Sequence, residues 1–524
     1  MLRRRALLKV AGGAGLASLV ASLARPRPAH AAGLYGELVP DPAGILDLPP
    51  GFTYRIVERW LDPMDDGLVV PHLPDGMGCF PGPDGTIILM RNHELSTTDG
   101  PYPLTAPPPE AYDKTTLGCV TRVVLDAVTF ERLSSNLVLC GTLKNCAGGS
   151  SPWGWLTCEE TTIAGHGFVF ACDPSATSVR PPQKIAAYGR CKREAVCIDP
   201  ARNIAYLTED QYGSALYRFV PDDPAEPFVG QLQALRVTGL DAYDMSLMPQ
   251  GSVLPIAWVD IDDPEPPEDT MRVEAKSKGA ALFARGEGIT FANNEIFMIA
   301  TAGGPKNKGQ IFRIIDHPKT PTIEALLVVT DPSLVDQPDN VTVAPWGDLF
   351  FGEDGGSGNF IRGVTPTGEV FDFAFNSLTA GEISGVCFSP DGRALFANLW
   401  GSGVTLVVTG PFPGATHGDD SDAGSGSASA SSSDSGDGDS DSDGLGDETA
   451  APTGEPVPDD SSSSSSAEAS TGDPLEVGGA FEELSCACRS DAAADPTTVL
   501  AITAALIVAA PARRCDIEPP PTED

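Results

Sequence analysis

Tight turns followed by short apolar runs recur through the chain from about Leu34 to Pro413. Pro83-Asp84-Gly85 precedes Thr86-Ile87-Ile88-Leu89, and Ser389-Pro390-Asp391-Gly392 precedes a similar run. Each unit places proline early in a turn and glycine where a positive φ is needed, and then opens a β-strand. Segments with a helical period are scarce. The sequence therefore predicts an all-β fold.

The number of these units limits the architecture. Strand hairpins recur at irregular intervals over most of the 524-residue chain, which is longer than most β-sandwiches. Radial repetition of four-stranded sheets accommodates many short strands, so we expect a β-propeller with about six blades over residues 32–413. A large β-sandwich is the alternative.

The first residues have the features of an export signal. Arg4-Arg5-Ala6-Leu7-Leu8-Lys9 forms a twin-arginine pattern, an apolar run follows from Val10 to Leu23, and Ala29-His30-Ala31 supplies a cleavage site. Residues 1–31 are therefore predicted to be a signal peptide for the twin-arginine route, which leads to a periplasmic, cell-surface or extracellular location. A basic N-terminal helix that stays on the mature chain is the alternative.

The acidity of the chain is concentrated after the strand-rich region. The formal net charge is −38, and no Lys or Arg occurs between Arg393 and Arg489. Residues 414–475 are rich in Ser, Asp and Gly and contain too little apolar surface to fold, so we expect a disordered linker. The net acidity also argues against a nucleic-acid partner.

The last segment, residues 476–524, combines three features. Cys486-Ala487-Cys488 is followed by an apolar run from Val499 to Ala510 and by Arg513-Arg514. This order resembles the tripartite C-terminal sorting tags of bacterial surface proteins, the myxobacterial type in particular. It predicts association with a membrane or the cell surface, although the apolar run is short for a membrane span. A simple amphipathic tail is the alternative.

One stretch, Asn145 to Glu160, brings together two thiols and two adjacent carboxylates. Cys146 and Cys158 lie close to Glu159 and Glu160, whereas the nearest imidazole is His166, outside the turn. This composition disfavours a Cys-His nucleophile and favours a metal site with oxygen and sulfur ligands. The twelve cysteines include no Cys-x-x-Cys with partner histidines, which argues against structural zinc, and their pairing stays open. A buried structural cysteine is the alternative.

Carboxylates recur in apolar or glycine-rich strand contexts elsewhere. In a propeller such residues meet at one end of the central channel, where several carboxylates need cations, and hard oxygen ligands suit Ca²⁺ or Fe³⁺. The alternative is that each carboxylate pairs with a nearby arginine, such as Arg193 or Arg285. The residues concerned are Glu94, Glu159, Glu160, Glu194, Glu209, Asp210, Glu287, Asp339, Glu353, Asp354 and Glu382.

An ordered set of motifs resembles the PhoX-type alkaline phosphatases. The set begins with Asn145-Cys146-Ala147-Gly148-Gly149 and Trp155-Leu156-Thr157-Cys158-Glu159-Glu160, continues with Phe283-Ala284-Arg285-Gly286-Glu287-Gly288 and Asp339-Asn340, and ends with Phe388-Ser389-Pro390-Asp391-Gly392-Arg393 and Thr409-Gly410-Pro411-Phe412. The resemblance runs from about Leu34 to Pro413. It implies a β-propeller, an active site with ferric iron (Fe³⁺) and calcium (Ca²⁺), small phosphate monoesters as substrates, and a monomer.

The same resemblance implies roles for single residues. Cys146 is similar to the thiolate ligand of iron, and Arg285 to the cation that contacts phosphate during catalysis. The carboxylate ligands implied are Glu160, Glu194 and Glu287 as bridging or terminal ligands, and Asp339 and Glu382 on the calcium side.

Two departures from the family pattern accompany these matches. Arg193 stands where family members usually have His, and Pro152-Trp153-Gly154-Trp155 is one residue shorter than usual, between Cys146 and Glu160. Two other functions therefore stay open. One is a catalytically degenerate surface propeller that keeps its metals. The other is a lactonase-like calcium propeller, which would not need Cys146.

Overall fold

The computed structural model describes residues 34–99, 107–356 and 358–413. The predicted signal peptide, acidic linker and C-terminal segment lie outside these residues, so their boundaries stay predictions. Among the residues that the structure describes, no helix is long and apolar enough to cross a membrane.

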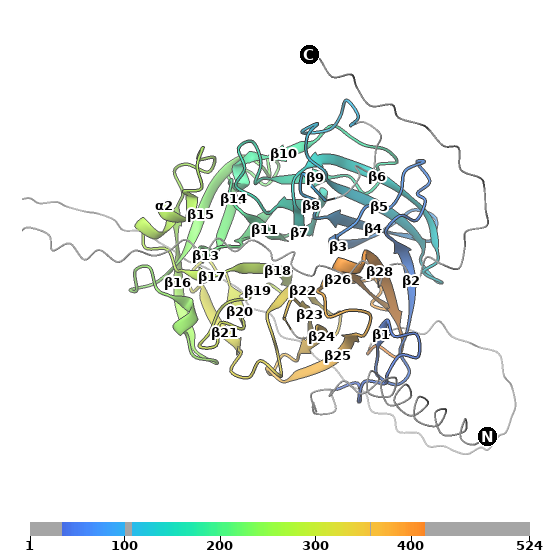
Figure 1. Ribbon diagram of the computed structural model, residues 1–524. Coiled ribbons are helices and arrows are strands. Elements are labelled where there is room, and N and C mark those ends of the chain that lie inside the picture. Colours follow the sequence, from blue (N-terminus) through green and yellow to red (C-terminus); the bar gives the residue numbers. More distant parts are fainter. Residues whose placement is uncertain (1–33, 100–106, 357, 414–524) are drawn as a thin grey trace, which may run out of the picture. The chain divides into compact units, whose positions relative to one another are not determined.

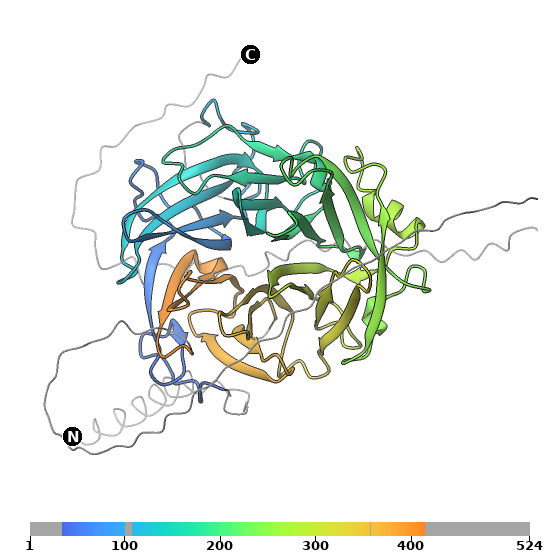
Figure 2. The ribbon, with the colours of Figure 1, turned by 180° about the vertical axis from the view of Figure 1, so that it is seen from behind.

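The described chain is a β-propeller built from antiparallel strands, as the turn-and-strand units predict (Figure 1, and from behind in Figure 2). Two four-stranded sheets come first in sequence. The first contains β3 (Pro74–Pro81), β4 (Thr86–His93), β5 (Gly118–Asp126) and β6 (Arg132–Thr142), and the second contains β7 (Asn145–Ser151), β8 (Gly154–Glu159), β9 (Val169–Cys172) and β10 (Gln183–Ile185).

A nine-stranded sheet follows, in which two four-stranded units are joined by one shared strand. The first unit contains β11 (Arg193–Asp199), β12 (Ile204–Glu209), β14 (Tyr217–Pro221) and β15 (Gly230–Val237), and the second contains β18 (Gly286–Ala292), β19 (Glu295–Ala300), β20 (Gln310–Ile315) and β21 (Thr322–Val328). The shared strand is β16 (Val253–Asp260), whose first residues pair with β21 and whose last residues pair with β15.

Strands from the two ends of the described chain meet in the remaining sheets. β22 (Pro338–Val343), β23 (Leu349–Glu353), β24 (Phe360–Val364) and β25 (Val370–Asn376) are completed by β1 (Leu46–Asp47). β26 (Ile383–Phe388), β27 (Ala394–Leu399) and β28 (Val404–Thr409) are completed by β2 (Thr53–Arg59). A two-stranded ribbon, β13 (Tyr212–Ser214) with β17 (Phe283–Ala284), and four short helical turns complete the fold. These turns are η1 (Ala186–Tyr188), η2 (Met245–Leu247), α2 (Met271–Ser277) and η3 (Trp400–Ser402).

The innermost strands form a closed ring around the channel. Each of β3, β7, β11, β18, β22 and β26 contacts the next, and β26 returns to β3. The propeller prediction is therefore confirmed. The number of continuous sheets differs from the number of blades predicted, because β16 fuses two of the six positions into one sheet. The turn motifs mark strands singly and cannot show such a fusion.

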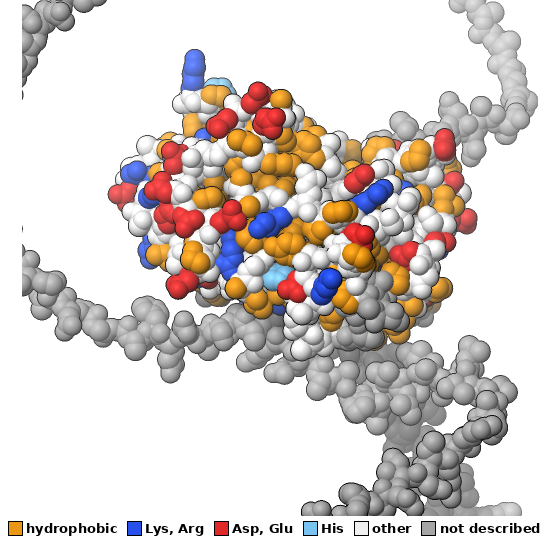
Figure 3. Space-filling view, turned by 90° about the horizontal axis from the view of Figure 1, so that it is seen from above, with side chains coloured by type: hydrophobic (Ala, Val, Ile, Leu, Met, Phe, Trp, Pro, Cys, Tyr) orange, Lys and Arg blue, Asp and Glu red, His pale blue; other side chains and the backbone are white. Residues whose placement is uncertain are grey.

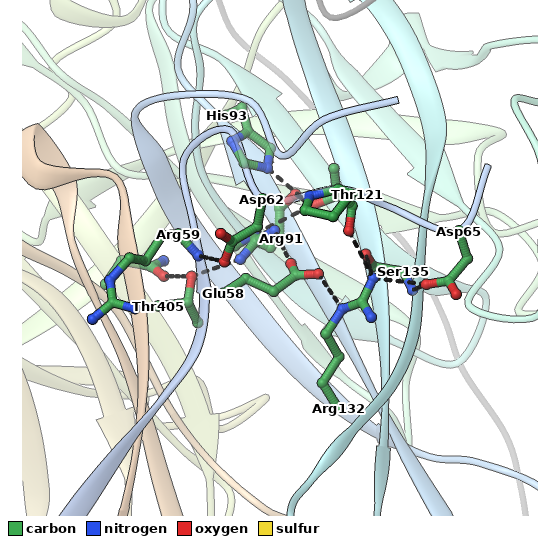
Figure 4. A network of polar contacts seen from close by, with 12 residues as sticks. Glu58, Arg59, Asp62, Asp65, Arg91, His93, Thr121, Arg132, Ser135 and Thr405 are labelled. Atoms are coloured by element: carbon green, nitrogen blue, oxygen red, sulfur yellow. Dashed lines mark hydrogen bonds and ion pairs between the residues drawn. The ribbon is translucent and has the colours of Figure 1, made fainter. Parts of the chain in front are cut away.

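A buried ion-pair network fixes the first sheet to the last (Figure 4). Glu58 on β2 contacts Arg91 on β4 at 2.7 Å and Arg132 on β6 at 2.7 Å, and only 1% of the Glu58 side chain is exposed. Arg91 also donates to Thr405 on β28 at 2.7 Å. Because β2 and β28 belong to the last sheet, these contacts close the ring between the two ends of the described chain.

Between the sheets the core is apolar, and around Phe373 it is largely aromatic. The ring of Phe373 contacts Phe52 edge to face, with centroids 5.1 Å apart, and stacks on Phe412 at 5.6 Å. On the surface side shown in Figure 3, acidic and basic side chains are interspersed among apolar ones. The described cysteines are all free thiols, so no disulfide contributes to this part of the fold.

Candidate metal centre

Five of the six inner strands begin with the same irregularity. The first residue of the inner strand pairs with the last residue of the next strand, and a register shift follows at once, as between Asn145, which pairs with Glu159, and Gly148. Such a β-bulge re-aims the side chain that it contains. The second residue of each strand, inside the bulge, is a potential ligand in all five: Asp75, Cys146, Glu194, Glu287 and Asp339.

Each of the six inner strands pairs with the strand that comes next in its blade, and in four of the six blades the residue directly after this second strand is acidic. Glu94, Glu160 and Asp210 come directly after β4, β8 and β12 and are buried, whereas Asp354 after β23 is exposed. The antiparallel pairing places these residues at the same end of the channel as the bulges. The strand pattern thus concentrates carboxylates at one end of the ring.

The five bulge residues, together with Glu94, form two compact groups of potential ligands. Asp75, Glu94 and Cys146 make one group, in which the Cys146 thiol lies 3.3 Å from Oδ2 of Asp75. Glu194, Glu287 and Asp339 make the other. Within each group the potential ligand atoms lie within 4.8 Å of one another. The structure therefore brings together four of the ligands implied by the family resemblance: Cys146, Glu194, Glu287 and Asp339.

Glu160 and Glu382 lie near these groups without belonging to either. Glu160 is held by two lysines, with Nζ of Lys192 at 3.3 Å and Nζ of Lys144 at 3.9 Å. Glu382 directly precedes β26 and is half-buried. Burial raises the pKa of Glu382 well above its usual value, and the carboxylates of Asp354 and Asp75 raise it further.

Arg285 lies beside the all-carboxylate group. Its guanidinium makes a bidentate ion pair with Asp210, at 2.6 and 2.9 Å, and Nη2 also lies 2.9 Å from Glu287. The backbone at Arg285 has a φ of +60°, a conformation that is uncommon outside glycine and concentrated at functional sites. The alternative raised from the sequence, a structural ion pair, is present, but its arginine is 21% exposed and faces the ligand groups.

Three carboxylate oxygens in the two ligand groups have no hydrogen-bond partner in the described structure. Both carboxylate oxygens of Glu194 and Oδ1 of Asp75 are buried and unpaired. Burial, reinforced by the charges of Glu287 and Asp339, raises the pKa of Glu194 well above its usual value. An uncompensated buried charge is costly, so this arrangement calls for cations. Carboxylate oxygens with one sulfur are a ligand set that fits calcium and iron.

Close backbone approach explains the glycines beside Cys146. A Cβ on Gly149 would lie 1.7 Å from the carbonyl oxygen of Val196, so glycine lets β7 lie against β11. On the other side, the side-chain amide of Asn92 donates to the carbonyl oxygens of Cys146 and Ala147, at 2.8 Å each. The Cys146 bulge is therefore held from both neighbouring sheets.

Neither departure from the family pattern places a side chain in the ligand groups. Arg193 is fully buried within its sheet, donates to the carbonyl oxygens of Thr208 and Tyr188, and lies over the ring of Tyr217. The shortened Pro152-Trp153-Gly154-Trp155 segment forms the turn between β7 and β8, at the opposite end of this hairpin from Cys146 and Glu160.

Sequence reasoning missed three residues of this centre. They are Asp75, which belongs to the first ligand group, and Lys144 and Lys192, whose ammonium groups lie beside Glu160. A signal for Asp75 exists in the repeat, because five of the six inner strands carry a potential ligand at their second position. This register becomes visible only when the strand starts are known.

Comparison with known proteins gives one family. The family described as Alkaline phosphatase PhoX matches residues 33–403, whereas no curated protein matches the sequence. Among solved structures, Pseudomonas fluorescens PhoX in complex with vanadate, a transition state analogue, has a TM-score of 0.56 at 18% identity and covers 74% of this chain and 99% of its own. A gluconolactonase from Xanthomonas campestris has a TM-score of 0.38 at 13% identity, with 74% and 100% covered. The similarity to the Pseudomonas structure concerns the fold. Since the family match spans nearly all of the described residues, the chain belongs to the PhoX alkaline phosphatase family.

Proposed function

We propose that this protein hydrolyses phosphate monoesters with iron and calcium ions held by the two ligand groups. The observation that carries the proposal is the pair of groups itself, with the unpaired, fully buried carboxylate of Glu194 in one of them. Family membership supplies the phosphatase activity. The ligand chemistry supplies the choice of metals.

The two groups differ in what they would bind. The group with the Cys146 thiol offers a soft ligand beside the carboxylates of Asp75 and Glu94, and sulfur favours iron over calcium. The group of Glu194, Glu287 and Asp339 is all oxygen, which suits hard cations such as calcium or ferric iron. Glu160 and Glu382 lie near enough to supply further carboxylate ligands.

Arg285 would bind the substrate phosphate. Metal ions in this site would neutralise the phosphate charge and provide a nucleophile near neutral pH. Arginine donates planar, charge-assisted hydrogen bonds that match phosphate oxygens. The carboxylates of Asp210 and Glu287 hold the guanidinium in a fixed orientation at the ligand groups, so the phosphate is oriented without cost at the moment of reaction.

We further propose that the protein acts outside the cytoplasm as a monomer. The twin-arginine pattern of residues 1–31 supports export of the folded protein, and residues 476–524 support association with a membrane or the cell surface. A substrate available there would be a small phosphate monoester.

The test is to purify the exported protein, measure its iron and calcium, and follow p-nitrophenyl phosphate hydrolysis. We expect both metals and steady turnover, with turnover and iron lost in Cys146→Ala. The matched control is Cys79→Ala, which changes a thiol in the same channel wall on β3 but outside both ligand groups. Full metal loading without turnover would instead indicate a degenerate propeller. Calcium without iron, with activity unchanged in Cys146→Ala, would overturn the proposal in favour of a lactonase-like enzyme.

A further inference from the structure

A cavity of about 810 Å³ lies next to Arg285, on the face of the propeller that carries the ligand groups. Its walls come from the β13–β17 ribbon, the η2 turn, the β19–β20 loop and the end of β21. Residues that line it include Tyr212, Asp244, Leu247, Phe283 and Ala284.

The wall of this cavity and the Arg285 site share one piece of backbone. Tyr212 follows Asp210 by two residues and pairs with Ala284, which directly precedes Arg285. The backbone amide of Arg285 donates to the carbonyl oxygen of Gln211 at 3.1 Å, and its guanidinium is paired with Asp210, so both parts of Arg285 are fixed to the chain that leads into the ribbon. A group that extends outward from a phosphate at Arg285 would therefore meet this cavity.

The lining is apolar and open. Tyr212 is 60% exposed and Leu247 is 69% exposed, although both are large apolar side chains, and Phe283 lies beneath them in the core. Neither lysine nor arginine lines the cavity among the described residues, and Asp244 contributes a carboxylate. Neutral apolar groups are therefore favoured there, and anionic groups are disfavoured by charge.

We propose that this cavity receives the leaving-group portion of the phosphate monoester and selects neutral, apolar, especially aromatic, alcohols or phenols. The proposal rests on the phosphatase function proposed above and adds the substrate class. Tyr212 and Leu247 are the residues that determine this specificity. Neither is expected to touch the reacting phosphorus.

The test compares phenyl phosphate with 2-naphthyl phosphate in the metal-loaded full chain. Both esters release a phenol, so the ratio of their kcat/KM values reports mainly the extra apolar surface of the second ring. We expect naphthyl phosphate to be the better substrate, and expect Tyr212→Ala and Leu247→Ala each to lower the naphthyl-to-phenyl ratio by about tenfold, a loss typical of a missing hydrophobic contact.

Two matched variants separate contact from general damage. Tyr212→Phe keeps the ring and is expected to keep the ratio. Leu133→Ala removes a leucine on β6 that is 53% exposed and does not line the cavity, and the ratio is expected to stay at the wild-type value. As a binding readout, a non-hydrolysable naphthyl phosphonate is expected to inhibit Tyr212→Ala about tenfold more weakly, whereas inhibition by inorganic phosphate changes little.

The outcomes are distinct. An active enzyme whose ratio is unchanged in Tyr212→Ala and Leu247→Ala overturns the inference and leaves the phosphatase function standing. An enzyme that hydrolyses an ester with an anionic leaving group, such as 3-phosphoglycerate, faster than naphthyl phosphate also overturns it. A metal-loaded protein that hydrolyses no ester at all overturns the proposed function, and the inference with it.

Discussion

Removal of the metals should make the stability of this protein strongly dependent on pH. Several carboxyl groups in the channel have pKa values above their usual range, because burial and neighbouring carboxylates disfavour the charged form; Glu194 and Glu287 are examples. At pH values above the usual pKa of these carboxyl groups, the folded state therefore binds more protons than the unfolded chain. The free energy of unfolding must then fall as the pH rises through this window.

Glu160 gives the magnitude for one such group. Burial, and then the charges of Asp210 and Glu94, raise the pKa of Glu160 from 4.5 to about 8. Between pH 5 and pH 8 the unfolded chain has lost this proton and the folded protein keeps it, which costs about 1.4 kcal/mol per pH unit and about 4 kcal/mol in all. For a folded unit of this size the loss corresponds to about 5 °C in Tm. The pKa of Asp210 is lowered, so its effect falls below this window.

Thermal unfolding at pH 5, 6, 7 and 8, with and without a chelator, measures this effect. We expect the chelated protein to lose at least about 5 °C from pH 5 to pH 8, and the metal-loaded protein to lose much less, because cations replace the protons. Glu160→Gln should make the pH dependence shallower, whereas Glu131→Gln, at a side chain that is 70% exposed, should not. A chelated protein as stable at pH 8 as at pH 5 would show that these carboxyl groups do not keep their protons in the folded state.

Three further substitutions test other parts of the structure. Glu58→Gln should lower the free energy of unfolding by about 3 kcal/mol in urea titrations, because it leaves Arg91 buried without its charge partner. A decrease in the free energy of unfolding below about 0.5 kcal/mol would show that the ion-pair network does not hold the ring closed. Gly385→Ala would place a Cβ 2.4 Å from the carbonyl oxygen of Asp75, at a backbone φ of +61°, and should reduce the amount of bound iron. Gly85→Ala, at a φ of +75° with open space around it, should leave the iron content unchanged. Equal iron in the two variants would contradict the close packing at Asp75. Arg285→Lys should lower kcat/KM for p-nitrophenyl phosphate by about a hundredfold, since lysine lacks the planar guanidinium that can donate two parallel hydrogen bonds to phosphate. A kcat/KM within threefold of the wild-type value would show that Arg285 does not bind the phosphate.

The fold was predictable because each turn motif specifies a strand locally. Pro83-Asp84-Gly85 and Ser389-Pro390-Asp391-Gly392 open β4 and β27 as expected. The fusion of two sheets through β16 was not predictable, because it depends on where a strand lies between two sheets and not on its residues. The same holds for β2, whose pairing with β28 joins residues more than 300 positions apart.

The candidate site was predictable in part. Cys146, Glu194, Glu287 and Asp339 stood out as polar residues in apolar or glycine-rich strands, and the structure groups them. Asp75 was missed because nothing in Pro74-Asp75-Gly76 distinguishes a ligand from a turn aspartate. The lysine partners of Glu160 were not identified either. Lys144 lies across the β7–β8 hairpin from Glu160, whose amide donates to its carbonyl oxygen at 2.9 Å, and a lysine at such a position carries no distinguishing pattern. Lys192 precedes β11, and its bridge to Glu160 depends on the contact between two neighbouring sheets.

Metal binding by the two ligand groups can be tested at Glu194, whose two carboxylate oxygens are buried without a hydrogen-bond partner in the described structure. We predict that elemental analysis of the purified wild-type protein gives both iron and calcium in whole-number amounts per chain. Glu194→Gln, which keeps the shape of the side chain and removes its charge, should bind at least one metal ion fewer and lose phosphatase activity, whereas Glu131→Gln should match the wild type. Equal metal content in Glu194→Gln and wild type would show that Glu194 holds no metal ion and would contradict its assignment as a ligand.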